Sequence, residues 1–180
     1  MKKFLTALLF TASITTASSA DSFLDYFGLG IALQDVDSTN FDNGTAVVVT
    51  GGKSLYEGMG MELEGSTSIQ KIEGKFNGMK DDINFWSLGM YSTYIWKLGN
   101  ISIKPRLGVV YRSLKSDIDI TAPKVPVAGT TYQNTDISGI GLSGGVGLTY
   151  DLGDGYNIYT NYTKIEDELS HLTFGAEFRF

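Results

Sequence analysis

The sequence predicts an all-β fold: an eight-stranded antiparallel transmembrane β-barrel with an up-and-down meander, preceded by a cleaved signal peptide. Three observations predict it. Apolar and polar residues alternate with a period of two in eight segments, as the side chains of half-buried strands do. Short and long connections follow one another in turn, and aromatic residues gather near the ends of the predicted strands.

The N-terminus has the pattern of a secretory signal peptide. A positively charged start is followed by an apolar run over residues 4–10 and by small residues up to Ala20, which predicts cleavage before Asp21. The apolar run is shorter than the roughly 20 residues that a membrane-spanning helix needs. We therefore expect a signal peptide over residues 1–20 and one barrel domain over residues 21–180.

Composition narrows the function classes. Removal of the signal peptide also removes Lys2 and Lys3. The mature chain then has twelve basic and twenty acidic side chains, which gives it a net charge of −8. An acidic surface argues against nucleic acid as a partner. The chain has no Cys and a single His, so disulfides and zinc sites are not expected. We expect no cofactor and no metal.

Each of the eight predicted strands carries apolar residues on one face. The last is the clearest, because Leu172, Phe174 and Phe178 alternate with polar residues. In the second strand Val47, Val48 and Val49 make both faces apolar, so its register stays open. The strands cover residues 27–33, 45–53, 59–64, 86–96, 101–112, 139–150, 156–164 and 171–180.

Connections of two kinds alternate along the chain. The short ones cover residues 54–58, 98–100 and 152–155, and the last contains Asp154-Gly155, a hairpin signal. The longer, polar ones cover residues 35–44, 68–82 and 115–136, with a shorter link at 166–168. Outer-membrane barrels are built with short periplasmic turns and long external loops, whereas a soluble β-sandwich has no reason to sort its loops in this way.

Aromatic residues are predicted to form two belts. Trp86, Tyr111 and Tyr162 lie toward the long loops. A larger group lies toward the short turns: Phe27, Tyr56, Tyr94, Trp96, Tyr150, Tyr156, Phe178 and Phe180. Two aromatic belts around an apolar middle are expected where a barrel crosses both membrane interfaces.

The sequence resembles the eight-stranded outer-membrane barrels typified by OmpA and OmpX. The resemblance rests on the alternating strand that ends at Phe180, the strand over residues 104–111 and the glycine-rich strand over residues 139–150. It implies a monomer in the outer membrane of a Gram-negative bacterium, in contact with outer-membrane lipid and lipopolysaccharide. It also implies that Phe174, Phe178 and Phe180 serve as the signal for the barrel-assembly machinery.

Inward-facing charges form the main candidate site. Eight strands leave an interior just wide enough for side chains, and buried charges are costly unless they are paired. We therefore expect a salt-bridged plug in the half of the barrel near the short turns, and the resemblance to OmpA-type barrels agrees. The expected members are Glu62, Glu64, Lys104, Arg106, Glu177 and Arg179.

Two other motifs could indicate ligand binding or catalysis. The Gly139–Gly144 segment matches a dinucleotide-binding pattern, but it lies within a predicted strand and no helix follows it. His171 resembles the base of small outer-membrane lipid-modifying enzymes, which also need a hydroxyl and a carboxylate beside it. No matching motif surrounds His171, so we expect no catalytic residues.

The sequence thus predicts a non-catalytic barrel with a structural or surface-interaction role and a lumen plugged by charged pairs. Two alternatives stay open. One is a small-solute or ion channel of the porin kind. The other is a lipid-modifying outer-membrane enzyme that uses His171.

Overall fold

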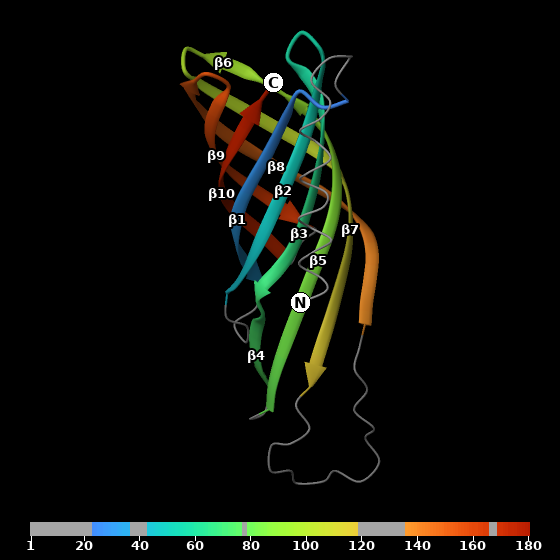
Figure 1. Ribbon diagram of the computed structural model, residues 1–180. Coiled ribbons are helices and arrows are strands. Elements are labelled where there is room, and N and C mark those ends of the chain that lie inside the picture. The colour runs from blue at the N-terminus through green and yellow to red at the C-terminus, as the bar shows by residue number, and fades with distance from the viewer. Residues whose placement is uncertain (1–22, 37–42, 77–78, 119–135, 166–168) are drawn as a thin grey trace, which may run out of the picture.

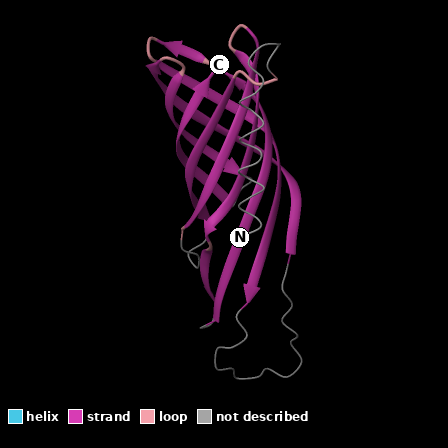
Figure 2. Cartoon of the chain, in the orientation of Figure 1, coloured by secondary structure: helices cyan, strands magenta, loops and turns pink. Residues whose placement is uncertain are grey.

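The computed structural model describes residues 23–36, 43–76, 79–118, 136–165 and 169–180, and most of them lie in long antiparallel strands (Figure 1, Figure 2). None of these residues forms a helix long and apolar enough to cross a membrane. The strands are β1 (Tyr26–Val36), β2 (Gly44–Tyr56), β3 (Met59–Gln70), β4 (Ile72–Phe76), β5 (Met79–Tyr94), β6 (Trp96–Leu98), β7 (Ile101–Ile118), β8 (Asp136–Gly153), β9 (Tyr156–Ile165) and β10 (Leu169–Arg179).

The sheet closes on itself as a barrel. The first strand β1 pairs with the last strand β10 from Tyr26–Arg179 to Val36–Leu169, while β5 pairs with β7 across the short β6. Because β4 continues β3 and β6 continues β5, the ten strands make an eight-stranded barrel in meander order. The predicted fold class is confirmed, while the predicted signal peptide and its cleavage site before Asp21 lie outside the described residues.

Burial alternates along the strands with the polarity of a membrane barrel. In β10 the polar side chains of His171 and Glu177 are buried, whereas Leu172 and Phe174 are exposed on the outer surface. This arrangement, with apolar side chains outside and polar side chains inside, is the reverse of that in a soluble protein. It suits a barrel whose outer surface is in contact with lipid. The open register of β2 is also settled, because Val48 is fully buried in the lumen and its two neighbours face outward.

The predicted loop over residues 68–82 is wrong. The described residues of this range lie mostly in strands, and β4 pairs with β5 from Ile72–Ile83 to Phe76–Met79. Polar residues on both faces led to the loop assignment, yet a ribbon that extends past the apolar belt has no need of an apolar face. The Asn77-Gly78 dipeptide, a strong hairpin signal, is the sequence feature that could have located it.

Other strand boundaries also differ from the sequence prediction, and β2 and β7 are two examples. β2 continues to Tyr56 and β7 to Ile118, so each strand takes residues that were assigned to loops. In β2 the register with β3 shifts between Ser54 and Tyr56, which marks an irregularity beside the turn. Both differences lengthen the walls without changing the number of strands.

Aromatic side chains ring both ends of the outer surface. Near the long loops, Trp86 and Tyr111 are exposed with ring centroids 5.3 Å apart. Near the short turns, the ring of Tyr156 lies 5.1 Å from that of Phe178, and Tyr94 lies 5.3 Å from Trp96. These positions agree with the two belts predicted from the sequence.

The Asp154-Gly155 turn should be sensitive to side-chain size. Both residues have positive φ, 53° and 79°, as the hairpin turn predicted by this dipeptide requires. A Cβ atom on Gly155 would lie 2.6 Å from the carbonyl oxygen of Arg179, whereas Gly99, also at positive φ, has no atom within 4 Å of such a position. Gly155→Ala should therefore lower the free energy of unfolding by about 2–3 kcal/mol and Gly99→Ala by only about 1 kcal/mol. Urea unfolding in detergent micelles would measure both, and equal losses would contradict the crowding.

Candidate functional site

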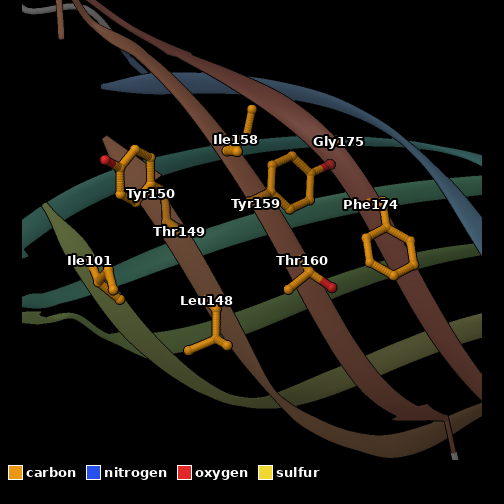
Figure 3. Close-up of a pocket in the computed structure, with 9 residues that line it drawn as sticks. All are labelled: Ile101, Leu148, Thr149, Tyr150, Ile158, Tyr159, Thr160, Phe174 and Gly175. Carbon is orange, nitrogen blue, oxygen red and sulfur yellow. The ribbon is translucent and has the colours of Figure 1, made fainter. Parts of the chain in front are cut away.

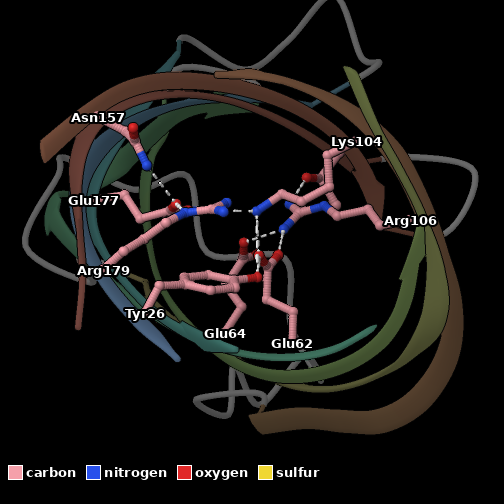
Figure 4. A network of polar contacts seen from close by, with 9 residues as sticks. Tyr26, Glu62, Glu64, Lys104, Arg106, Asn157, Glu177 and Arg179 are labelled. Atoms are coloured by element: carbon pink, nitrogen blue, oxygen red, sulfur yellow. Dashed lines mark hydrogen bonds and ion pairs between the residues drawn. The ribbon is translucent and has the colours of Figure 1, made fainter. Parts of the chain in front are cut away.

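The charged side chains predicted to plug the lumen project from three walls of the barrel toward its axis (Figure 4). Glu62 and Glu64 come from β3, Lys104 and Arg106 from β7, and Glu177 from β10. Strand alternation puts each of them on the inner face, since their neighbours Met61, Leu63 and Leu107 are exposed on the outside. All five are buried.

Glu62 is the centre of the first cluster. Its carboxylate forms an ion pair with the Lys104 ammonium through one oxygen, and the other oxygen lies 2.8 Å from Nη1 of Arg106. The same Nη1 lies 2.7 Å from Oε2 of Glu64. Since the side chains of Glu62 and Arg106 are 0% exposed, these are desolvated charges held by direct contact between β3 and β7 across the lumen.

A second cluster surrounds Glu177 nearer the short-turn end. Its carboxylate accepts a hydrogen bond from the amide of Asn157 at 3.1 Å and one from Nε of Arg179 at 2.9 Å. The Lys104 ammonium lies 3.8 Å away and links the two clusters. Arg179 is one third exposed, which places it at the mouth. In total three carboxylates face three cations, so the network is neutral.

Sequence reasoning missed Tyr26 as a member of this network. Its hydroxyl donates to Oε2 of Glu62 at 2.5 Å, and the Lys104 ammonium lies 4.9 Å from its ring centroid (Figure 4). Strand parity could have placed it inside, because Tyr26 is in phase with Gly28 on β1. In the structure it pairs with Gly52, where a side chain would collide with the ring.

Arg106 is further held by uncharged neighbours. Its guanidinium lies 4.6 Å from the ring centroid of Tyr91, a cation–π contact. Nη2 donates to the hydroxyl of Thr163, and the Tyr91 hydroxyl is hydrogen-bonded to Ser143 at 3.1 Å. Arg106 thus ties together β3, β5, β7 and β9.

The lumen half toward the long loops is apolar in part, which the sequence did not predict. Phe85, Val110, Ile165 and Leu169 are almost fully buried and pack together between β5, β7, β9 and β10. The described residues therefore fill the lumen with two layers, a charged one near the short turns and an apolar one near the long loops. Among these residues, no group of three or more acidic, His or Cys side chains is placed to hold a metal ion.

His171 lies beside the apolar layer and points into the lumen. It is fully buried, its Nε2 lies 3.1 Å from the side-chain nitrogen of Gln34, and the edge of its ring meets Phe85 with centroids 5.4 Å apart. Its Nδ1 has no hydrogen-bond partner among the described residues. A base that activates a hydroxyl needs that hydroxyl on one ring nitrogen and an orienting carboxylate on the other, and here the amide of Gln34 takes one of these places.

The three residues proposed as an assembly signal lie on the outer surface of the barrel. Phe174 and Phe178 point outward from β10, and Phe180 follows the end of this strand. The Phe180 amide donates to the carbonyl oxygen of Asp25 at 3.2 Å, so the last residue is fastened to the segment before β1. Their rings are therefore accessible to lipid or to a partner protein.

A closed eight-stranded barrel with an apolar outer surface, two aromatic belts and a charged lumen defines a small outer-membrane protein. The profile of the outer membrane protein beta-barrel domain family matches residues 4–180, and the chain belongs to this family. It therefore crosses the outer membrane of a Gram-negative bacterium with eight strands. No curated protein sequence matches the chain.

Solved structures share this fold at low sequence identity. OprG from Pseudomonas aeruginosa is 16% identical, with a TM-score of 0.63 over 87% of this chain and 97% of its own. Ail, the attachment invasion locus protein of Yersinia pestis, in complex with the heparin analogue sucrose octasulfate, is 17% identical, with a TM-score of 0.59 over 86% and 97%. Neisserial surface protein A is 15% identical, with a TM-score of 0.58 over 86% and 96%. At these identities the likeness concerns the fold.

Proposed function

We propose that this protein is a closed, non-conducting barrel with a structural or surface-interaction role in the outer membrane. The observation that carries the proposal is the fully buried contact of Arg106 with Glu62 and Glu64, which spans the lumen from β7 to β3. An eight-stranded barrel has no room for these side chains and a water-filled path beside them. A porin-like channel, the main alternative, would need this network to open.

The second lumen layer supports the same proposal. An ion that passed the charged cluster would next meet the apolar cluster of Phe85, Val110, Ile165 and Leu169, against which the side chain of His171, paired with that of Gln34, is packed. Moving an ion through an apolar constriction without water is strongly unfavourable. The two layers are thus barriers of different chemistry in series.

A surface-interaction role is supported by the shape of the loop end. There β4, β5 and β7 extend beyond β1, β9 and β10, so part of the wall projects past the rest of the rim (Figure 1). Ail, a structural relative, is an attachment protein by name. The net charge of −8 predicted for the mature chain disfavours a polyanion such as the heparin analogue bound by Ail as the ligand of this protein.

Planar-bilayer recording of the purified mature protein tests the closed lumen. We expect no steady unitary current in 1 M salt at moderate voltage, because the charged layer is closed by direct contact rather than by screened surface charges. A known porin inserted under the same conditions is the control for insertion and sensitivity. A reproducible unitary current from the wild-type barrel would replace the closed-barrel proposal with the channel alternative.

Replacing His171 should leave the lipids unchanged. We expect the lipid A and phospholipid composition of cells that produce His171→Ala to equal that of cells with the wild-type protein, because among the described residues the buried ring has neither a hydroxyl to activate nor a carboxylate to orient it. Mass spectrometry of extracted lipids from both strains and a deletion strain measures this. An acylation change that depends on His171 would establish the enzyme alternative.

A further inference from the structure

A hollow of about 470 Å³ lies on the membrane-facing surface near the short-turn end. Its lining includes Gly51 at an outward position of β2, between the larger residues Leu63 of β3 and Lys53 of β2. Leu24, in the segment before β1, lies over Gly51, where a Cβ atom would come within 2.9 Å of it. Met61 and Met90 complete an apolar lining with flexible side chains.

An ion pair stands at the end of this hollow. Nζ of Lys53 lies 3.0 Å from Oδ1 of Asp25, and the Ser54 amide donates to Oδ2 at 2.7 Å. Asp25 is fixed by its own backbone as well, since its amide donates to the carbonyl oxygen of Gly52 at 2.7 Å. Partial burial raises the pKa of Asp25, but the Lys53 and Ser54 contacts outweigh it and leave this pKa below its usual value. The carboxylate is therefore ionised at neutral pH.

We propose that this hollow and the Asp25–Lys53 pair bind a phospholipid of the periplasmic leaflet whose zwitterionic headgroup carries a primary ammonium. The headgroup phosphate faces the Lys53 ammonium, the headgroup ammonium faces the Asp25 carboxylate, and one acyl chain lies in the hollow between Leu24, Met61 and Leu63. The Lys53–Asp25 ion pair stays intact, and each of its two charges gains a contact with a headgroup charge of opposite sign. A lysine ammonium has three donors and a carboxylate about four acceptor positions, so both can serve two partners.

The charges select this headgroup over others. An anionic headgroup that approaches Lys53 also meets the negative charge of Asp25. A headgroup with a trimethylated nitrogen has no N–H to donate to the carboxylate. The short-turn end faces the periplasm, which places the site in the phospholipid leaflet of the outer membrane rather than beside lipopolysaccharide.

A second hollow on the same surface provides an internal control. It measures about 410 Å³ and lies between β8, β9 and β10, with Leu148, Ile158 and Phe174 among its lining residues (Figure 3). Its lining contains no carboxylate and no amine. It can accept an acyl chain but has nothing to distinguish one headgroup from another.

Native mass spectrometry of the mature protein, released from micelles that contain equal amounts of three lipids, tests the proposal. The lipids are phosphatidylethanolamine, phosphatidylcholine and phosphatidylglycerol with identical acyl chains. We expect one bound phosphatidylethanolamine, retained about fivefold or more over each of the other two, as the loss of a charge-assisted hydrogen bond predicts. Equal retention of the three lipids, or preference for phosphatidylglycerol, would overturn the proposal.

Three variants assign the effect to this site. Asp25→Asn keeps an acceptor for the Ser54 amide and should abolish the preference over phosphatidylcholine, while Lys53→Met should lower retention of all three headgroups. Gly51→Leu adds a side chain that displaces Leu24 into the hollow and should remove the bound lipid, whereas Thr160→Leu in the control hollow should leave it. Heat-dependent gel migration verifies that each variant is folded. A folded Asp25→Asn barrel that keeps the wild-type preference would show that the ion pair does not recognise the headgroup.

Discussion

Replacing Arg106 by alanine is expected to lower the free energy of unfolding by about 3–5 kcal/mol, the usual loss when one partner of a buried ion pair is removed. Glu64 would lose Arg106 as its ion-pair partner, while Glu62 would keep its contacts with Lys104 and the Tyr26 hydroxyl. The change also removes the guanidinium from the ring of Tyr91 and the donor from Thr163. Urea unfolding of the barrel in micelles, followed by tryptophan fluorescence, measures the loss.

Arg179→Ala is the matched control. Arg179 belongs to the same network, but it is one third exposed and bonds Glu177 at the mouth of the barrel. A partly solvated pair contributes only about 0–1 kcal/mol, so this variant should be close to wild type. Similar losses from both arginines would mean that the position of Arg106 across the lumen has no special role.

Restoring charge balance should rescue the Arg106 variant. In Arg106→Met with Glu64→Gln, the Glu62–Lys104 and Glu177–Arg179 pairs remain and no carboxylate is left without a cation. We expect this double variant to regain at least half of the stability lost in Arg106→Met alone, since neutral replacements of a complete buried pair are often tolerated. A double variant as unstable as the single one would attribute the loss to packing rather than charge.

The same change should affect ion passage. Removing the Arg106 side chain opens space between β3 and β7 and leaves the lumen with excess negative charge, so we expect a small cation-selective current in planar bilayers. The apolar layer around Phe85 and Val110 lies in series with the charged layer and should keep this current small. An unchanged current in Arg106→Ala, together with unchanged stability, would contradict the plug.

The alternation of side chains along the strands allowed us to predict which charged residues face the lumen. It did not allow us to predict which of them are in contact across the lumen. A period of two assigns Glu62 and Arg106 to the inner face, and counting from the short turns assigns them a similar depth. It does not say how far the strands tilt, and tilt decides which residues meet across the axis. The contact of Tyr26 with Glu62 and the apolar cluster around Phe85 depend on that geometry, so they were missed.

The wrong loop assignment over residues 68–82 has a related cause. Alternation reveals a strand only where its two faces meet different solvents. The sequence of the β4–β5 ribbon lacks this apolar–polar contrast, although its backbone pairs from Ile72–Ile83 to Phe76–Met79. For the same reason β7 ends later than the sequence indicated, at Ile118.

Phe180→Ala is expected to reduce insertion of the barrel into the outer membrane several-fold while leaving the stability of the folded barrel almost unchanged. The ring of Phe180 is 54% exposed on the outer surface, and its nearest aromatic contact is Phe178 at 5.9 Å between centroids. Lipid can replace most of these contacts in the folded state. If the ring is part of the assembly signal, its loss acts on the path to the membrane and not on the final structure.

Tyr156→Ala separates this effect from the general loss of an aromatic ring. Tyr156 is exposed to a similar degree at the same end of the barrel, and its ring also contacts Phe178, at 5.1 Å. Because Tyr156 lies outside the last strand, we expect the Tyr156→Ala variant to insert like the wild-type protein. Pulse labelling of cells, with the heat-modifiable form in outer-membrane fractions as the readout, follows insertion over time.

Deletion of Phe180 should be more severe than Phe180→Ala, because it also removes the amide that donates to Asp25 and fastens the end of the chain beside β1. Refolding of purified chains into lipid vesicles without any assembly factor separates the contribution of the ring as a signal from the contribution of the amide to barrel closure. The alanine variant should refold like wild type there, whereas the deletion should refold less completely. An alanine variant that fails equally in vesicles and in cells would assign the defect to barrel closure and remove the argument for a recognition signal.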